Sequence, residues 1–123
     1  LEELQKRINE GFKTIMDMFG VEISCDWVDK TPGAEVSEEA MKIAKESIIE
    51  ALGIECLEKP ISTPGSDDFH YYTILRPNLK AAMIGIGADL TPGLHHPKMT
   101  FNKEALITGA KVLTTTLRNA VNE

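Results

Sequence analysis

The sequence of 123 residues has little of what several common functions require. Basic residues are outnumbered, with 13 Lys and Arg against 19 Asp and Glu and a formal net charge of -6. Because phosphate backbones are bound by clustered Lys and Arg, this balance argues against a nucleic-acid partner. No apolar run approaches the roughly 20 residues that span a bilayer, and the N-terminus is charged and amphipathic. We therefore expect neither a membrane segment nor a signal peptide.

Cysteine is also scarce. Cys25 and Cys56 show no metal-ligand spacing and lie in apolar-looking strands, so we expect buried free thiols in a reducing, cytoplasmic compartment. No order of Ser, His and Asp, or of Cys and His, points to a nucleophilic triad. Two glycines flank Ile86, but a nucleotide-binding loop needs a third glycine before a helix. The 42% of hydrophobic and 26% of charged residues instead indicate a single ordered unit that buries a core.

Apolar residues at spacings of three and four predict three long helices. The first spans residues 2–19 and ends at Gly20. The second begins after Ser37 as its N-cap and ends at Gly53, and the third is capped by Asn102. The expected buried faces are, in order, Leu4, Ile8, Phe12, Ile15, Met16 and Phe19; Met41, Ala44, Ile48, Ala51 and Leu52; and Leu106, Ile107, Ala110, Leu113, Leu117 and Val121.

Strands are predicted in three places. Residues 21–28 alternate between apolar and polar side chains, which is typical of a strand with one buried face. Residues 54–57 are a short strand candidate, and the continuous apolar run 81–87 predicts a central strand covered on both faces. A short helix is expected within 66–72, ending before Pro77. Together these patterns predict an α/β fold in which helices pack on a mixed sheet.

His95 and His96 follow the run 81–87, at the position where open α/β sheets usually bind ligands. Zinc enzymes hold each ion with about three protein ligands and one open position, and no other His or Cys lies near this pair in the sequence. Because successive side chains diverge, at most one of the two should reach a given ion. Pro97 favours an extended His96 and a stiffer loop. A role as ordinary polar loop residues is the open alternative.

The segment 65–69 also allows two interpretations. A Ser or Asp ahead of a helix first of all caps it, and two acids at a helix start are explained by the helix dipole. In the functional interpretation, the Ser66 hydroxyl and the amides of the helix start face a substrate carboxylate. Asp67 and Asp68 are then candidates for contact with a metal, although neighbouring side chains diverge. His70 is expected on the helix surface.

Three blocks of the sequence read GSDDFHYY at 65–72, IGIGA at 84–88 and HHPKMTFNKEAL at 95–106. In order and spacing, they resemble the C-terminal part of the M20 metallopeptidase and amidohydrolase family. The resemblance covers about half of the chain and is greatest to amidohydrolases of N-acyl amino acids, such as aminoacylases, hippurate hydrolases and aminobenzoyl-glutamate hydrolases. Asp67 stands where Glu is commoner in the family.

The resemblance implies roles for particular residues. The first His of the family's His-x-Pro block is a metal ligand, which corresponds to His95. From the residues alone, and not from the resemblance, His96 and Asp68 are candidates to support the metal site through hydrogen bonds, and Ser66 is a candidate to contact the substrate. The other ligands, typically Cys, His, Glu and His, and the catalytic Glu belong to the N-terminal half of the family, so no catalytic residue is expected in this chain.

The resemblance also implies the chemistry of the complete enzyme. It would hold two divalent ions, zinc or else manganese, cobalt or nickel, since one imidazole does not choose among them. A water bridging the two ions is deprotonated by the catalytic Glu and attacks a polarised amide carbonyl.

The implied organisation has two parts. Residues 1–29 would be the last helix and strand of an inserted α+β lid or dimerisation domain, and residues 30–123 the C-terminal half of a zinc-peptidase-like catalytic domain. Turn residues at 30–35 fit a boundary there. Because many relatives carry an Asn after the lid strand, where this chain reads Gly33-Ala34-Glu35-Val36, no substrate role is assigned to that loop.

The expected function is therefore that of a segment of an amidohydrolase or carboxypeptidase acting on N-acyl amino acids or peptide-like substrates. The segment should be inactive without the N-terminal half of the same enzyme, and a homo-oligomer is expected. The alternative is a free-standing, non-catalytic binding domain that kept the fold.

Overall fold

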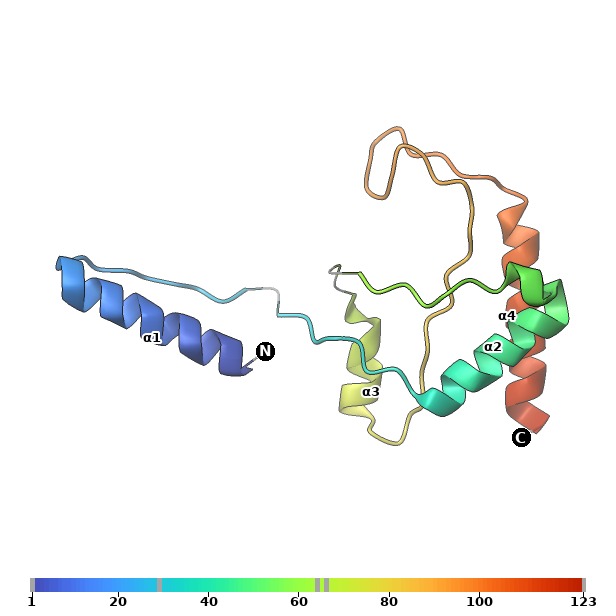
Figure 1. Cartoon of the computed structure of the whole chain (residues 1–123), viewed down its shortest axis with the longest axis horizontal. Coiled ribbons are helices and arrows are strands. Elements are labelled where there is room, and N and C mark those ends of the chain that lie inside the picture. The colour runs from blue at the N-terminus through green and yellow to red at the C-terminus, as the bar shows by residue number, and fades with distance from the viewer. Residues whose placement is uncertain (1, 29, 64, 66, 123) are drawn as a thin grey trace.

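A computed structural model of the chain describes residues 2–28, 30–63, 65 and 67–122. Figure 1 shows α2 and α4 packed across each other, with α1 lying apart from them. Within the described ranges, no helix is long and apolar enough to cross a membrane. The elements in chain order are α1 (Glu2–Phe19), α2 (Glu38–Leu52), the 3-10 helices η1 (Ile54–Cys56) and η2 (Asp68–His70), α3 (Tyr71–Leu75) and α4 (Ala105–Asn122).

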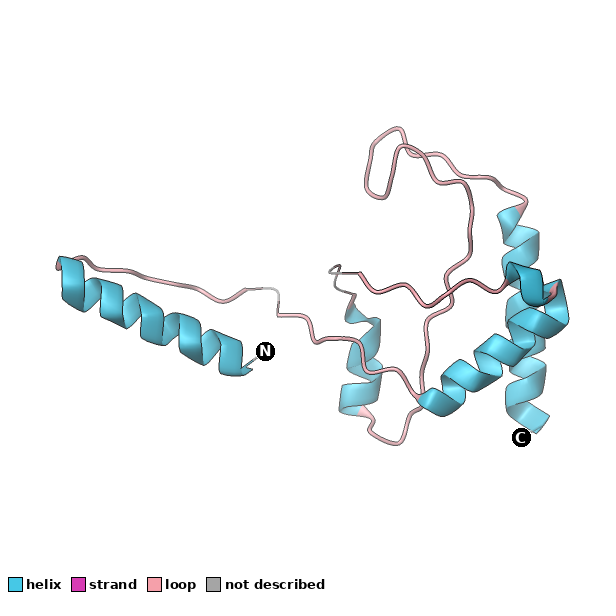
Figure 2. Cartoon of the chain, in the orientation of Figure 1, coloured by secondary structure: helices cyan, strands magenta, loops and turns pink. Residues whose placement is uncertain are grey.

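The described residues do not form the expected mixed sheet: they are 53% helix and 2% strand. Their only strand-like pairing is an isolated antiparallel bridge between Thr91 and Thr100. Residues 21–28 and 81–87 are loop, and the third predicted strand is the helix η1 (Figure 2). The predicted α/β fold was wrong. An apolar pattern indicates only that a segment favours an extended backbone, whereas a strand also needs hydrogen bonds to a neighbouring strand.

The apolar run 81–87 is nevertheless extended and covered on one face. Ala82, Ile84 and Ile86 are half-buried while Met83 is 57% exposed, and this alternation has the period of two of an extended chain. The Ile86 side chain lies 3.7 Å from the position that a Cβ on Gly109 of α4 would occupy. The run therefore packs beside α4 with one face, rather than being covered on both.

The helix ends follow capping rules. The Ser37 hydroxyl accepts a hydrogen bond from the amide of Ala40 at 3.3 Å, which starts α2. Gly20 and Gly53 end α1 and α2 with φ of 64° and 97°, a region that favours glycine. The three long helices are thus confirmed, and η2 with α3 confirms the short helix predicted before Pro77.

The helix α4 packs on α2 through its small residues, not its large apolar ones. Val112 is fully buried, and the half-buried residues on the same side are Ala105, Thr108, Gly109, Thr115, Thr116 and Asn119. The stripe that the sequence predicts to be buried lies on another side and is exposed throughout: Leu106, Ile107, Ala110, Leu113, Leu117 and Val121. The predicted helix is correct, but its predicted buried face is wrong, because small side chains allow the closest approach of two helices.

A polar network fixes α2 against α4. Ser47, which is fully buried, accepts a hydrogen bond from Asn119 Nδ2 at 3.1 Å and donates to the carbonyl of Ile43 at 2.7 Å. Asn119 Nδ2 also donates to Glu50 at 3.1 Å, and Glu50 forms an ion pair with Arg118. The hydrogen bonds from Asn119 and then Arg118 hold the pKa of Glu50 below its ordinary value.

The helix α1 contacts no other helix in the part of the chain that the structure describes. The segment that follows it turns back along it (Figure 1), and the indole of Trp27 donates to Asn9 Oδ1 at 3.3 Å. The predicted buried face of α1 is largely open, with Leu4 58% and Phe19 67% exposed and no residue of the helix buried. The helix α1 therefore lies apart from the packed helices α2 and α4 and adds nothing to their core.

Two expectations about burial were wrong. Cys25 and Cys56 are free thiols, as expected, but both are exposed, because no sheet forms around the segments that carry them. His70, expected on the surface, is only 4% exposed, and its Nδ1 has no hydrogen-bond partner among the described residues. Its ring meets that of Phe69 edge-on, with centroids 5.3 Å apart. The start of α3 therefore buries a polar ring instead of displaying it.

Candidate functional site

The loop that carries both histidines is closed at its base by backbone hydrogen bonds. Thr91 and Thr100 exchange both of theirs, at 3.1 and 2.9 Å, in the pattern of an antiparallel pair. Beyond this pair, the amide of Asn102 donates to the carbonyl of Ala88 at 2.8 Å. We call residues 88–102 the histidine loop; it is a small hairpin with fixed ends.

Two consecutive turns shape the tip of the histidine loop. The amide of His96 donates to the carbonyl of Gly93 at 3.4 Å, and the amide of Met99 donates to the carbonyl of His96 at 2.9 Å. His95 is the third residue of the first turn and has a φ of 65°, a left-handed conformation that costs a non-glycine residue about 1 kcal/mol or more. Pro97 is the second residue of the second turn, a position that its fixed φ suits.

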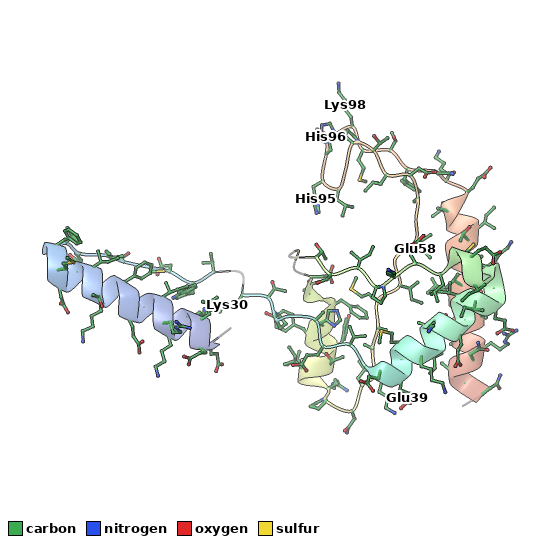
Figure 3. All side chains as sticks on the ribbon, viewed as in Figure 1. Lys30, Glu39, Glu58, His95, His96 and Lys98 are labelled. Atoms are coloured by element: carbon green, nitrogen blue, oxygen red, sulfur yellow. The ribbon has the colours of Figure 1, made fainter. Side chains whose placement is uncertain are left out.

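The two imidazoles differ in which nitrogens are free. Nδ1 of His96 accepts a hydrogen bond from the amide of Lys98 at 3.1 Å. A neutral imidazole has one N–H and one lone pair, so Nε2 of this His96 carries the proton and offers no lone pair to a metal. His95 is exposed, and its ring has no hydrogen-bond partner among the described residues. Figure 3 shows the two rings at separate points on the loop.

A divalent metal ion fits the donor that His95 offers, because a neutral imidazole with a free lone pair suits zinc, cobalt and nickel. His95 has a left-handed backbone in a tight turn and is exposed, so an ion has access to this residue. Across 2–28, 30–63, 65 and 67–122, no group of three or more His, Cys, Asp or Glu side chains is placed to hold a metal ion.

The segment 65–69 is organised around a helix cap. Asp67 accepts a hydrogen bond from the amide of Phe69 at 2.8 Å and starts η2, which is the capping role that the sequence allowed. Asp68 is exposed, and neither acid bonds to the histidine loop in the described part of the chain. Ser66 lies outside the described residues, so its contact with substrate stays a prediction.

Asp89 was not predicted to belong to the site, and Asn102 was predicted only as a helix cap. Asn102 Oδ1 accepts from the amide of Glu104 at 3.0 Å, just before α4. In the other direction, Asn102 Nδ2 donates to Asp89 Oδ2 at 3.3 Å. Asp89 has a φ of 50°, which Asp and Asn tolerate better than most residues. Two features of the sequence could have indicated this pair: Asp89 follows the apolar run 81–87, and the side-chain amide of Asn102 can donate and accept hydrogen bonds at the same time.

A model of the peptidase family M20/M25/M40 matches residues 3–119. The chain belongs to this family, which confirms the resemblance in the three sequence blocks. Comparison with curated proteins and with solved structures found no match. The family match supports a function of the metal-dependent peptidase or amidohydrolase kind.

Proposed function

We propose that the chain is a segment of a metal-dependent amidohydrolase or carboxypeptidase that hydrolyses the amide bond of N-acyl amino acids or similar small amides. The observation that carries the proposal is the difference between the two imidazoles. His95, the first His of the family's His-x-Pro block, has a ring without hydrogen bonds to the described residues, whereas Nδ1 of His96 accepts one from the amide of Lys98. The family match supports the class of reaction.

In this proposal His95 binds one of two divalent ions, zinc or else manganese, cobalt or nickel. Such ions, when bound, polarise the amide carbonyl and lower the pKa of a bound water. The two turns fix the backbone at His95, so less freedom is lost when its ring binds an ion. His96 donates from Nε2 to a neighbouring ligand, Asp68 supports the site from η2, and Ser66 contacts the substrate.

The proposed organisation follows the domain boundary expected at residues 29 and 30. Residues 1–29 end a lid or dimerisation domain, and residues 30–123 belong to the catalytic domain. The separation of α1 from the other helices and its open apolar face favour this division. The remaining ligands and the catalytic Glu come from the N-terminal half of the same enzyme, so the segment is inactive alone. The enzyme acts in the cytoplasm as a homo-oligomer.

Replacing His95 tests the proposal in the full-length protein. His95→Ala should remove one ion per protomer and lower turnover by more than about 100-fold, the upper range for residues that only support a ligand. His96→Ala is the matched control: it removes an adjacent imidazole but no lone pair that binds metal. It should keep both ions and lose about 10- to 100-fold in turnover, the range for residues that support a ligand.

Metal content is measured by elemental analysis and turnover with a panel of N-acyl amino acids. Unchanged metal content and turnover in His95→Ala would sink the assignment. An equal loss of metal in His96→Ala would show that the hydrogen bond from Lys98 does not decide which imidazole binds.

A further inference from the structure

We infer that Asp89 and Asn102 form a latch that positions His95, so that metal binding depends on a side-chain pair several residues away from the ligand. The inference rests on the proposed function of His95. Neither Asp89 nor Asn102 touches a reacting group; both are positioning residues. We call the hydrogen bond from Asn102 Nδ2 to Asp89 Oδ2, at 3.3 Å, the latch.

The latch joins the two ends of the histidine loop to the helical core. Asn102 uses its single side-chain amide in both directions, since Oδ1 accepts from the amide of Glu104 while Nδ2 donates to Asp89. Glu104 immediately precedes α4, and α4 is packed on α2. The latch therefore connects the segment that enters the loop with the helix that leaves it.

The backbone of the loop needs such a restraint. Asp89 and His95 both have positive φ, at 50° and 65°, and they are the only non-glycine residues of the described chain that do. Conformations of this kind cost about 1–3 kcal/mol each and persist only where the surroundings impose them. His95 is exposed, so no packing imposes its conformation. The restraint comes from the two turns at the tip together with the closed ends of the loop.

Two side-chain contacts cross the base of the histidine loop, the latch and the contact of Thr100 with Thr91, and they differ in how strongly they hold the loop closed. The hydroxyl of Thr100 reaches the carbonyl of Thr91 only at 3.4 Å, near the limit for a hydrogen bond. The latch is also long, but its acceptor is a carboxylate, and a hydrogen bond to a charged group is stronger than one between neutral groups. Loss of the latch should therefore free the loop more than loss of the threonine contact.

An exchange of the two side chains separates the latch from the helix cap. Asn102→Asp places a second carboxylate opposite Asp89 and opens the latch by repulsion, yet Asp caps a helix as well as Asn does. The double variant Asp89→Asn with Asn102→Asp restores an amide–carboxylate pair in the reverse direction. Asn also tolerates the positive φ at position 89. The single and double variants thus differ in the latch while both keep the cap.

The experiment uses the full-length protein loaded with cobalt, whose visible absorption reports on coordination. In Asn102→Asp the cobalt site that is lost in His95→Ala should bind at least about tenfold less tightly, and its absorption band should change. The turnover number at saturating cobalt should recover, with KM unchanged. The exchanged double variant should return both cobalt affinity and spectrum to the wild-type values.

Wild-type cobalt affinity in Asn102→Asp, or no recovery in the double variant, overturns the latch. If Asn102→Asp does not fold, as judged by thermal unfolding, Asp89→Gly removes the acceptor while suiting the positive φ, and it should also weaken cobalt binding. His95→Ala is measured alongside. If His95→Ala loses one ion and the latch variants do not, only the latch is wrong. If His95→Ala keeps both ions, the proposed function itself is wrong.

Discussion

At the scale of single residues, His70 stands in an unfavourable environment. It is almost fully buried, and its Nδ1 has no hydrogen-bond partner in the part of the chain that the structure describes. A buried polar atom left without a partner costs about 1–3 kcal/mol. The ring contact with Phe69 offsets part of this cost through packing.

Replacing His70 should therefore stabilise the chain if the space stays filled. We expect His70→Leu to raise the free energy of unfolding by about 1 kcal/mol, because it removes the unpaired nitrogen and keeps an apolar side chain against Phe69. His70→Ala is the control, and the cavity that it leaves should lower stability by about 2 kcal/mol. Urea denaturation measures the free energy of unfolding of both variants. An equal loss of stability in His70→Leu and His70→Ala would show that the imidazole makes a hydrogen bond that stabilises the fold.

At the scale of elements, the packing of α4 decides which of its residues matter for stability. Val112 is fully buried against α2, whereas Leu117 is 67% exposed. Val112→Ala should lower the free energy of unfolding by about 1–2 kcal/mol, while Leu117→Ala should change it by less than about 0.5 kcal/mol. The hydrophobic pattern of the sequence alone predicts the opposite, namely a larger loss of stability at Leu117 than at Val112. A larger effect at Leu117, measured by urea denaturation, would show that the large apolar face is the one that packs.

The contact between α2 and α4 should also depend on pH through Glu50. Its folded pKa lies below the ordinary value of 4.5, mainly because of hydrogen bonds from Asn119 and Arg118. A lowered folded pKa stabilises the fold above pH 4.5, and this contribution is lost as the pH falls through the folded pKa. Because Glu50 is exposed, salt should weaken the effect.

Glu50→Gln isolates this contribution. Its thermal unfolding midpoint should lie below that of the wild type at neutral pH, and the difference should shrink as the pH falls below 4.5. A difference that stays constant across this range would show that the carboxylate charge plays no part. Repeating the titration at high salt distinguishes the charge of Glu50 from its packing.

The helices could be predicted because their signals are local. Ser37, Gly20 and Gly53 act within one turn of their own helices, and the structure places each at the expected end. The predicted strands were wrong, because whether a run such as 81–87 pairs into a sheet depends on residues far away in the sequence. The metal role of His95 rests on three sequence blocks, but the bond from Lys98 to His96 appears only once the second turn is formed.

At the scale of the whole molecule, much apolar surface lies open. The large residues of α4 and of α1 are exposed together with Met83 and Ile61, which is 85% exposed. Apolar surface of this extent usually marks a place where another protein surface packs. This agrees with the proposal that the rest of the same enzyme covers it.

The isolated chain should therefore self-associate. Light scattering after size-exclusion chromatography should give a mass above that of the 13.6 kDa monomer. Leu113→Lys together with Leu117→Lys should shift the chain toward monomer by placing charges on the open face of α4. Asn122→Lys is the control, since it adds a charge to the same helix outside that face. A wild-type chain that is monomeric and unfolds cooperatively would contradict the prediction.

The double use of Asn102 has a consequence for the order in which the protein assembles. Its Oδ1 is engaged at the start of α4 and its Nδ2 donates to Asp89, so we expect the histidine loop to close as that helix start forms. Because metal affinity that depends on a formed site is also folding free energy, the ion should enter late, after α4 has docked on α2. A chelator added during refolding would then delay the last step and leave the helices to form at their usual rate.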